Sequence, residues 1–159
     1  MSHDRIGLLR IVWTSIIALL LTIAPLPDSL IAARPDWMLL LVIYWILNAP
    51  LIAGLAYAWV CGLMMDALVG TLLGEHALAF VLIAAVTHRF QLRMRIFPVL
   101  HQAAVVLLMV FLYHWLLYVI SGMAGEQISS WLRWLPALVS AIFWPVLVSV
   151  LDTLNRLSR

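Results

Sequence analysis

The amino-acid sequence predicts an all-α integral membrane protein folded as a bundle of six helices. Hydrophobic residues make up 66% of the chain and charged residues only 10%. No charged residue occurs between Trp37 and Met65 or between Ile96 and Gly125. Since about 20 apolar residues in a helix cross the roughly 30 Å of bilayer hydrocarbon, gaps of this length are typical of membrane spans. The apolar runs are continuous rather than alternating, which favours helices over a β-barrel.

Helix-breaking residues divide the chain into a single transmembrane domain of six expected spans. Pro25 and Pro27 end the first span, because proline cannot continue a helix. Pro35 begins the second, since proline is favoured in a first helical turn, and Asn48 and Pro50 follow its end. The expected spans are residues 6–24, 35–47, 51–73, 76–90, 98–121 and 131–153.

The second expected span, residues 35–47, is the shortest. As a helix it is only about 20 Å long, less than an average bilayer requires. It is therefore either a short helix, accommodated by a locally thinner membrane or by a position inside the bundle, or part of a re-entrant or broken pair.

The arginines indicate how the spans are oriented. All nine basic residues are arginine, and cytoplasmic loops of membrane proteins carry an excess of such charge. Six spans with both termini in the cytoplasm leave only Arg34 and Arg133 outside. The seven arginines expected inside are Arg5, Arg10, Arg89, Arg93, Arg95, Arg156 and Arg159. The scattered arginines form no basic stripe, which argues against a nucleic-acid binder.

Asp66 is the one carboxylate expected deep within a span, where an unpaired charge costs about 2.5–3.5 kcal/mol. It belongs to a row of small residues spaced by four, which lets another backbone approach closely. The row is Gly54, Ala58, Gly62, Asp66, Gly70 and Gly74. Asp66 either binds a proton, ion or substrate in a cavity, or caps or hydrogen-bonds a neighbouring helix.

The segment Arg34-Pro35-Asp36-Trp37 joins the first two expected spans on the outer face. Asp36 suits a helix N-terminus because of the helix dipole, and Pro35 suits the first turn. These residues are thus either local structural determinants or, through Arg34, a binding site for a partner. A second strip of small residues, Thr14, Ala18 and Thr22, suits helix docking on the first span.

Catalytic chemistry is not indicated. His88, His101 and His114 lack the spacing of metal ligands, and the single cysteine, Cys61, cannot form an internal disulfide. The sequence contains no serine-nucleophile motif, phosphate-binding loop or dinucleotide turn. We therefore expect no enzyme, cofactor or metal. The basic turn at residues 88–95 either sets topology or holds anionic lipid or a cytoplasmic partner.

The order of these motifs resembles the rod shape-determining protein MreD family. The resemblance rests on Pro25-x-Pro27, on Arg34-Pro35-Asp36-Trp37, on the run ending at Leu47, and on Gly62-x-x-x-Asp66-x-x-x-Gly70-x-x-x-Gly74. It covers the whole chain in length and span number and is most specific between residues 25 and 80.

The resemblance implies a non-catalytic scaffold of the cell-elongation machinery in the bacterial inner membrane. Such a subunit binds MreC and is linked indirectly to MreB, RodA and the elongation transpeptidase. The family also resembles the six-helix substrate-capture subunits of energy-coupling-factor vitamin transporters. A substrate-binding transporter subunit, with Asp66 near a ligand, is therefore the alternative function.

Overall fold

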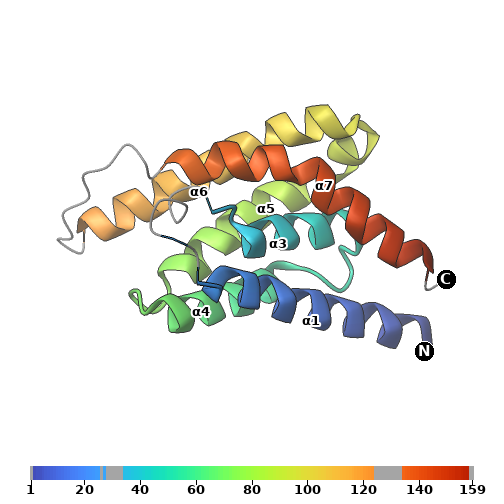
Figure 1. Cartoon of the computed structure of the whole chain (residues 1–159), viewed down its shortest axis with the longest axis horizontal. Coiled ribbons are helices and arrows are strands. Elements are labelled where there is room, and N and C mark those ends of the chain that lie inside the picture. The colour runs from blue at the N-terminus through green and yellow to red at the C-terminus, as the bar shows by residue number, and fades with distance from the viewer. Residues whose placement is uncertain (1, 26, 28–33, 124–133, 158–159) are drawn as a thin grey trace.

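The structure, a computed structural model, describes residues 2–25, 27, 34–123 and 134–157, and the side chains of residues 7–25, 27, 34–123 and 134–156. Arg5, Arg133, Arg159 and the start of the sixth expected span fall outside these side chains. Six α-helices occupy the described residues (Figure 1). They are α1 (Ser2–Ile23), α3 (Trp37–Asn48), α4 (Leu55–Val69), α5 (Glu75–Ile96), α6 (Val99–Met123) and α7 (Leu135–Leu157).

The ends of α4 differ from the sequence-based expectation. Residues 51–73 were expected to form one helix, but α4 ends at Val69 because Gly70 takes the left-handed conformation, with φ 74°. Gly74, with φ 103°, then begins α5. Glycine adopts positive φ without the clash of a Cβ atom, so these two glycines form a turn. The expectation that the row of small residues runs along a single helix is therefore wrong at its ends, since Gly54, Gly70 and Gly74 lie outside α4.

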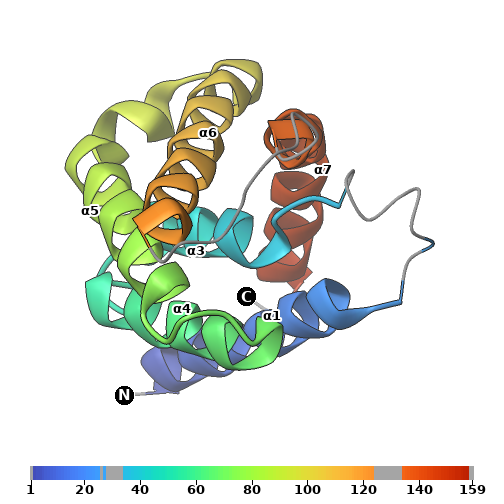
Figure 2. The same cartoon turned by 90° about the vertical axis from the view of Figure 1, so that its left-hand side faces the viewer.

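The short helix α3 lies at the centre of the bundle (Figure 2). Every residue from Met38 to Leu47 is buried, and none is more than 4% exposed. A helix that is apolar on all sides is stable only when other helices surround it. At about 18 Å, α3 is too short for an average bilayer, and its position inside the bundle explains how so short a helix is accommodated. Of the two arrangements expected for this segment, the structure has the buried helix.

The helices α4 and α5 approach each other most closely, at Gly62. A methyl group on Gly62 would lie 2.6 Å from the backbone nitrogen of Ala77. Glycine at this crossing lets the two backbones touch, which is how small residues hold membrane helices together. The middle of the small-residue row is therefore used within the bundle.

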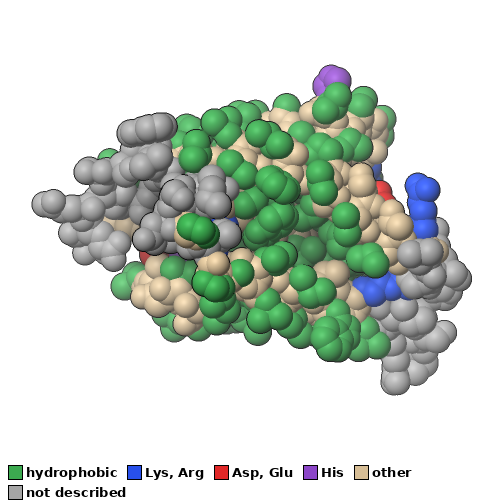
Figure 3. All heavy atoms as spheres, in the orientation of Figure 1, with side chains coloured by type: hydrophobic (Ala, Val, Ile, Leu, Met, Phe, Trp, Pro, Cys, Tyr) green, Lys and Arg blue, Asp and Glu red, His purple; other side chains and the backbone are tan. Residues whose placement is uncertain are grey.

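Three of the described helices are long and apolar enough to cross a membrane: α5, α6 and α7. The helices α3 and α4, and the apolar part of α1, are shorter. Large apolar side chains cover much of the surface, such as Trp13, Leu108 and Ile142 (Figure 3). A surface of this composition suits lipid as the surrounding solvent.

Candidate functional site: carboxylates that join helices

Asp66 lies in the last turn of α4 and is 1% exposed. Its Oδ2 accepts a hydrogen bond of 2.8 Å from the backbone N–H of Gly74, and its Oδ1 accepts one of 2.8 Å from that of His76. The His76 Nδ1 lies 2.9 Å from the same Oδ1. Thr71 lies within hydrogen-bond distance of both side chains.

This geometry is that of a helix cap supplied by another helix. The first N–H groups of any helix lack partners within it, and they carry the positive end of the helix dipole. The Asp66 carboxylate satisfies such groups at the start of α5, so a carboxylate can be buried here without remaining unpaired. Asp66 lines none of the described cavities, although its neighbour Met65 does.

Two further carboxylates bind α6 at the same end of the bundle, called here the carboxylate end. Glu75 Oε1 accepts a 2.6 Å hydrogen bond from Ser121, and Asp36 Oδ2 lies 2.8 Å from His114 Nε2. The backbone N–H of Asp36 donates to Ser140 Oγ on α7 at 2.9 Å. Asp36 lies at the N-terminus of α3, where the sequence predicts it, but its side chain makes no capping hydrogen bond there and reaches α6.

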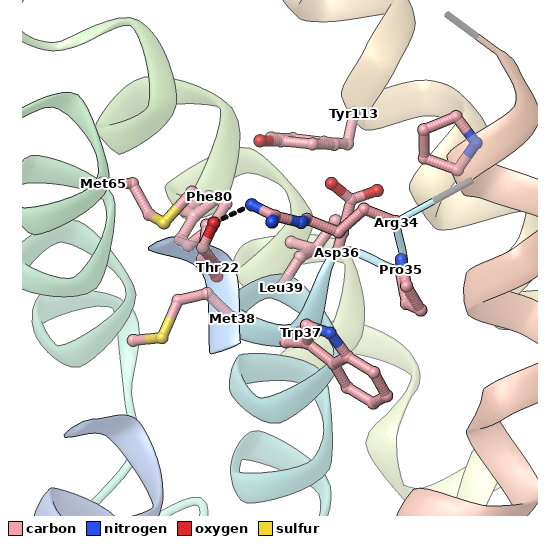
Figure 4. Close-up of a pocket in the computed structure, with 11 residues that line it drawn as sticks. Thr22, Arg34, Pro35, Asp36, Trp37, Met38, Leu39, Met65, Phe80 and Tyr113 are labelled. Atoms are coloured by element: carbon pink, nitrogen blue, oxygen red, sulfur yellow. Dashed lines mark hydrogen bonds between the residues drawn. The ribbon is translucent and has the colours of Figure 1, made fainter. Parts of the chain in front are cut away.

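Arg34 holds the end of α1. Its guanidinium donates a hydrogen bond to the backbone carbonyl of Thr22 (Figure 4) and another to that of Ala24. A helix C-terminus leaves such carbonyls without partners. Among the described residues its Nε finds no acceptor. A cavity of about 170 Å³ is lined by the segment Arg34-Pro35-Asp36-Trp37 and, on α6, by Tyr113. This volume is below the roughly 300–1,000 Å³ of typical ligand sites.

A fourth carboxylate, which sequence reasoning missed, joins helices at the opposite end. Tyr44 on α3 donates a 2.6 Å hydrogen bond to Asp152 Oδ1 on α7, and Asn155 donates to the Tyr44 hydroxyl at 2.9 Å. The sequence places Asp152 near a helix end and gives it no obvious partner. A tyrosine hydroxyl inside an apolar run was the available signal, because such a group requires a partner when buried.

The small-residue strip of α1 also contacts the interior. Thr14 Oγ1 accepts a hydrogen bond of 3.0 Å from Trp45 Nε1 on α3, and Ala18 is 5% exposed. Thr22 donates to the Ala18 carbonyl of its own helix. Like Gly62, Thr14 and Ala18 serve contacts inside the bundle.

All four carboxylates whose side chains are described therefore bind a different helix. Asp66 joins α4 to α5, Glu75 joins α5 to α6, Asp36 joins α3 to α6, and Asp152 joins α7 to α3. Asp36, Asp66 and Glu75 lie at the carboxylate end of the bundle, and Asp152 lies at the opposite end. Within the described residues, no group of three potential metal ligands forms. The arrangement fixes helices relative to one another.

The fold and these hydrogen bonds define a helical membrane bundle in which the described carboxylates hold neighbouring helices together. The family model described as rod shape-determining protein MreD matches residues 4–154. The chain is also 26% identical, over 141 residues, to the rod shape-determining protein MreD of Haemophilus influenzae, covering 89% of this chain and 87% of that one. No solved structure matches the chain.

The chain belongs to the MreD family, and its role lies in rod shape determination. The family match reaches into every described helix. The four carboxylates that bind a neighbouring helix therefore lie within the region that this chain shares with the family. The resemblance to energy-coupling-factor subunits finds no support among solved structures. What remains common to both is an α-helical membrane bundle.

Proposed function

We propose that this protein is a non-catalytic scaffold of the rod-shape machinery. It spans the bacterial inner membrane several times, binds MreC, and through it helps to couple the cytoskeleton to peptidoglycan synthesis. MreB, RodA and the elongation transpeptidase are its indirect partners. The family membership gives the process, and the geometry of the carboxylates supports the mode of action.

The observation that carries the proposal is the commitment of every described carboxylate to a contact between helices. A transporter subunit or an enzyme needs polar groups that converge on a substrate. Here the described carboxylates instead join helices to one another, and the large exposed surface is apolar. An apolar exterior on a bundle held together in this way is what a scaffold offers to the membrane helix of a partner.

Copurification tests the proposal. The protein carrying an affinity tag, extracted in mild detergent, is expected to retain MreC at a fixed molar ratio and to hold no vitamin-sized molecule. A tightly bound small metabolite that is lost in Asp66→Asn, with no MreC retained, would instead support the transporter alternative.

We infer that residues 34–37 position the outer end of the bundle for this partner. Arg34 ties this segment to the end of α1, so Arg34→Ala is expected to weaken MreC retention. The matched control is Arg89→Ala, which removes an exposed arginine far along the chain from this segment. Equal MreC retention by both variants would remove Arg34 from the partner-binding role.

The proposed orientation places both termini in the cytoplasm. Arg10, Arg95 and Arg156 come from three helices and line one pocket, which supports placing them on the same side. Reporter fusions after Arg93 and at the C-terminus are both expected to report cytoplasm. A periplasmic signal from either fusion would contradict the orientation.

A further inference from the structure

A basic pocket of about 330 Å³ opens at the end of the bundle opposite Asp66, called here the arginine end. The pocket is lined by Arg10, Trp45, Asn48, Arg95, Asp152, Asn155 and Arg156. Among the described side chains that line it, three guanidinium groups face one carboxylate, which leaves a net charge of two positive. That carboxylate, Asp152, already accepts the hydrogen of Tyr44. The pocket is therefore suited to an anion.

The contact that Arg95 makes with the end of α3 is long. Its Nη2 lies 3.4 Å from the Asn48 carbonyl, beyond the usual 2.7–3.2 Å or so for such a bond. A guanidinium carries five N–H donors in a planar fork that matches a phosphate. Arg95 and Arg156 are also exposed, so a phosphate can reach them.

An apolar groove of about 360 Å³ runs between α1 and α7 with α3 as its floor. Figure 3 shows the hollow in the face that carries apolar side chains, and basic side chains at one end of that face. The groove is lined by Thr14, Ile17, Ala18, Leu21, Trp37, Leu41, Phe143, Val146, Leu147, Val150, Leu151 and Leu154. It is too small to enclose a helix, which is about 10–12 Å wide with its side chains.

The groove and the basic pocket adjoin each other. Trp45 lines the pocket, and its Nε1 donates to Thr14, which lines the groove. On α7, Leu154 lines the groove and the next residue, Asn155, lines the pocket. One end of the apolar groove therefore lies beside a cluster of arginines.

We propose that this composite site binds one anionic phospholipid. The phosphate lies among Arg10, Arg95 and Arg156, and one acyl chain lies in the groove between α1 and α7. Basic pockets between membrane helices bind such head groups elsewhere, because the arginines supply charge and the helices supply an apolar wall. The lipid fills a gap that the helices leave open.

Native mass spectrometry of the purified full-length chain in detergent tests this site. Phosphatidylglycerol and phosphatidylcholine are titrated separately, and the first binding event is compared. We expect one phosphatidylglycerol to bind about tenfold or more tightly than phosphatidylcholine, since phosphatidylcholine's own ammonium group opposes the arginines. Equal affinities would overturn the proposal.

Matched variants locate the head group. Arg10→Gln combined with Arg156→Gln is expected to remove the preference for phosphatidylglycerol, whereas Arg89→Gln combined with Arg93→Gln, the same change of charge outside the pocket, keeps it. Arg95 is exposed, so Arg95→Gln is expected to leave folding intact and to reduce the preference for phosphatidylglycerol severalfold. This variant keeps the test decisive if the double variant fails to fold. An unchanged preference in both pocket variants would contradict the assignment.

A second pair locates the acyl chain. Val146→Trp fills the groove and is expected to weaken phosphatidylglycerol binding, while Leu108→Trp, on the exposed face of α6, leaves it unchanged. Soluble glycerol phosphate at the same concentration is expected not to compete. Competition by glycerol phosphate, or binding that Val146→Trp leaves intact, would show a soluble phosphate rather than a lipid at this site.

Discussion

The helices α4 and α5 pack closely against each other, whereas α1 and α7 are separated by a groove. The first pair touches backbone to backbone at Gly62 and Ala77, and Asp66 ties its end together through the first N–H groups of α5. The second pair flanks a groove of about 360 Å³. At the arginine end of that pair, Arg10 lies 3.4 Å from Asn155.

The difference teaches that a strip of small residues closes a helix pair only when the facing residue is also small. Ala77 faces Gly62, so two backbones can meet. The α1 strip, with Thr14 and Ala18, lines the groove together with the larger side chains of Val146 and Leu147 on α7. Close packing replaces the hydrophobic effect between helices in lipid, so the first pair is the stable core of the bundle.

The largest effect is expected at the crossing of α4 and α5. Gly62→Ala places a methyl group against the Ala77 backbone, which cannot move as a flexible side chain does. We expect a loss of at least about 3 kcal/mol of unfolding free energy, measured by SDS titration of the detergent-solubilised protein.

The control for this substitution is Gly122→Ala, where an added Cβ meets no atom within 4 Å. Since Gly122 lies in the last turn of α6, alanine is expected to stabilise the helix by less than the roughly 0.5–1 kcal/mol that it gains in the middle of a helix. Equal losses for both variants would mean that the close approach of α4 and α5 does not hold the bundle.

A smaller loss is expected for Asp66→Asn. The amide nitrogen of asparagine must face one of the two N–H donors of Gly74 and His76, so one buried donor loses its acceptor. This costs about 2 kcal/mol, within the range of about 1–3 kcal/mol for such a group. The same titration measures it, with Thr71→Val expected to cost less because its bonds of 3.3 and 3.2 Å are longer. A loss no larger than that of Thr71→Val would remove the capping role.

The joint between Asp36 and His114 allows a double-mutant cycle. Asp36→Asn and His114→Phe are each expected to cost about 1–2 kcal/mol, and the two effects are expected not to add, because both remove one interaction. Additive losses would show that the two side chains do not depend on each other.

The smallest effect is expected at the groove. Val146 is 57% exposed, so Val146→Ala is expected to change the unfolding free energy by no more than about 0.5 kcal/mol. A loss comparable to that of Gly62→Ala would show that α1 and α7 close over the groove in the membrane.

The sequence predicted the helices better than the joints between them. Long apolar runs and prolines were enough to find six helices, and the short apolar run at residues 35–47 was enough to suggest a buried helix such as α3. The ends of α4 do not follow from the spacing of the glycines, because glycine suits close helix packing and a turn of positive φ equally well, and Gly70 and Gly74 form a turn.

The partners of the carboxylates could not be predicted, because most of them lie far away along the chain. Asp36 and His114 are separated by 78 positions, and Tyr44 and Asp152 by 108. Hydropathy locates the helices without specifying which of them are neighbours. Asp66 was the exception, since Gly74 and His76 follow it closely and the capping alternative was local.

The most direct test of the central claim compares folding with cell shape for Asp66→Asn. The variant replaces the native protein in a rod-shaped bacterium, and the folded amount in the membrane is measured beside cell width. Because Asp66 holds α4 and α5 together, we predict that the cells become round in proportion to the loss of folded protein. Round cells that contain the variant at full level, with the stability of the native protein, would contradict the account and assign Asp66 a chemical role.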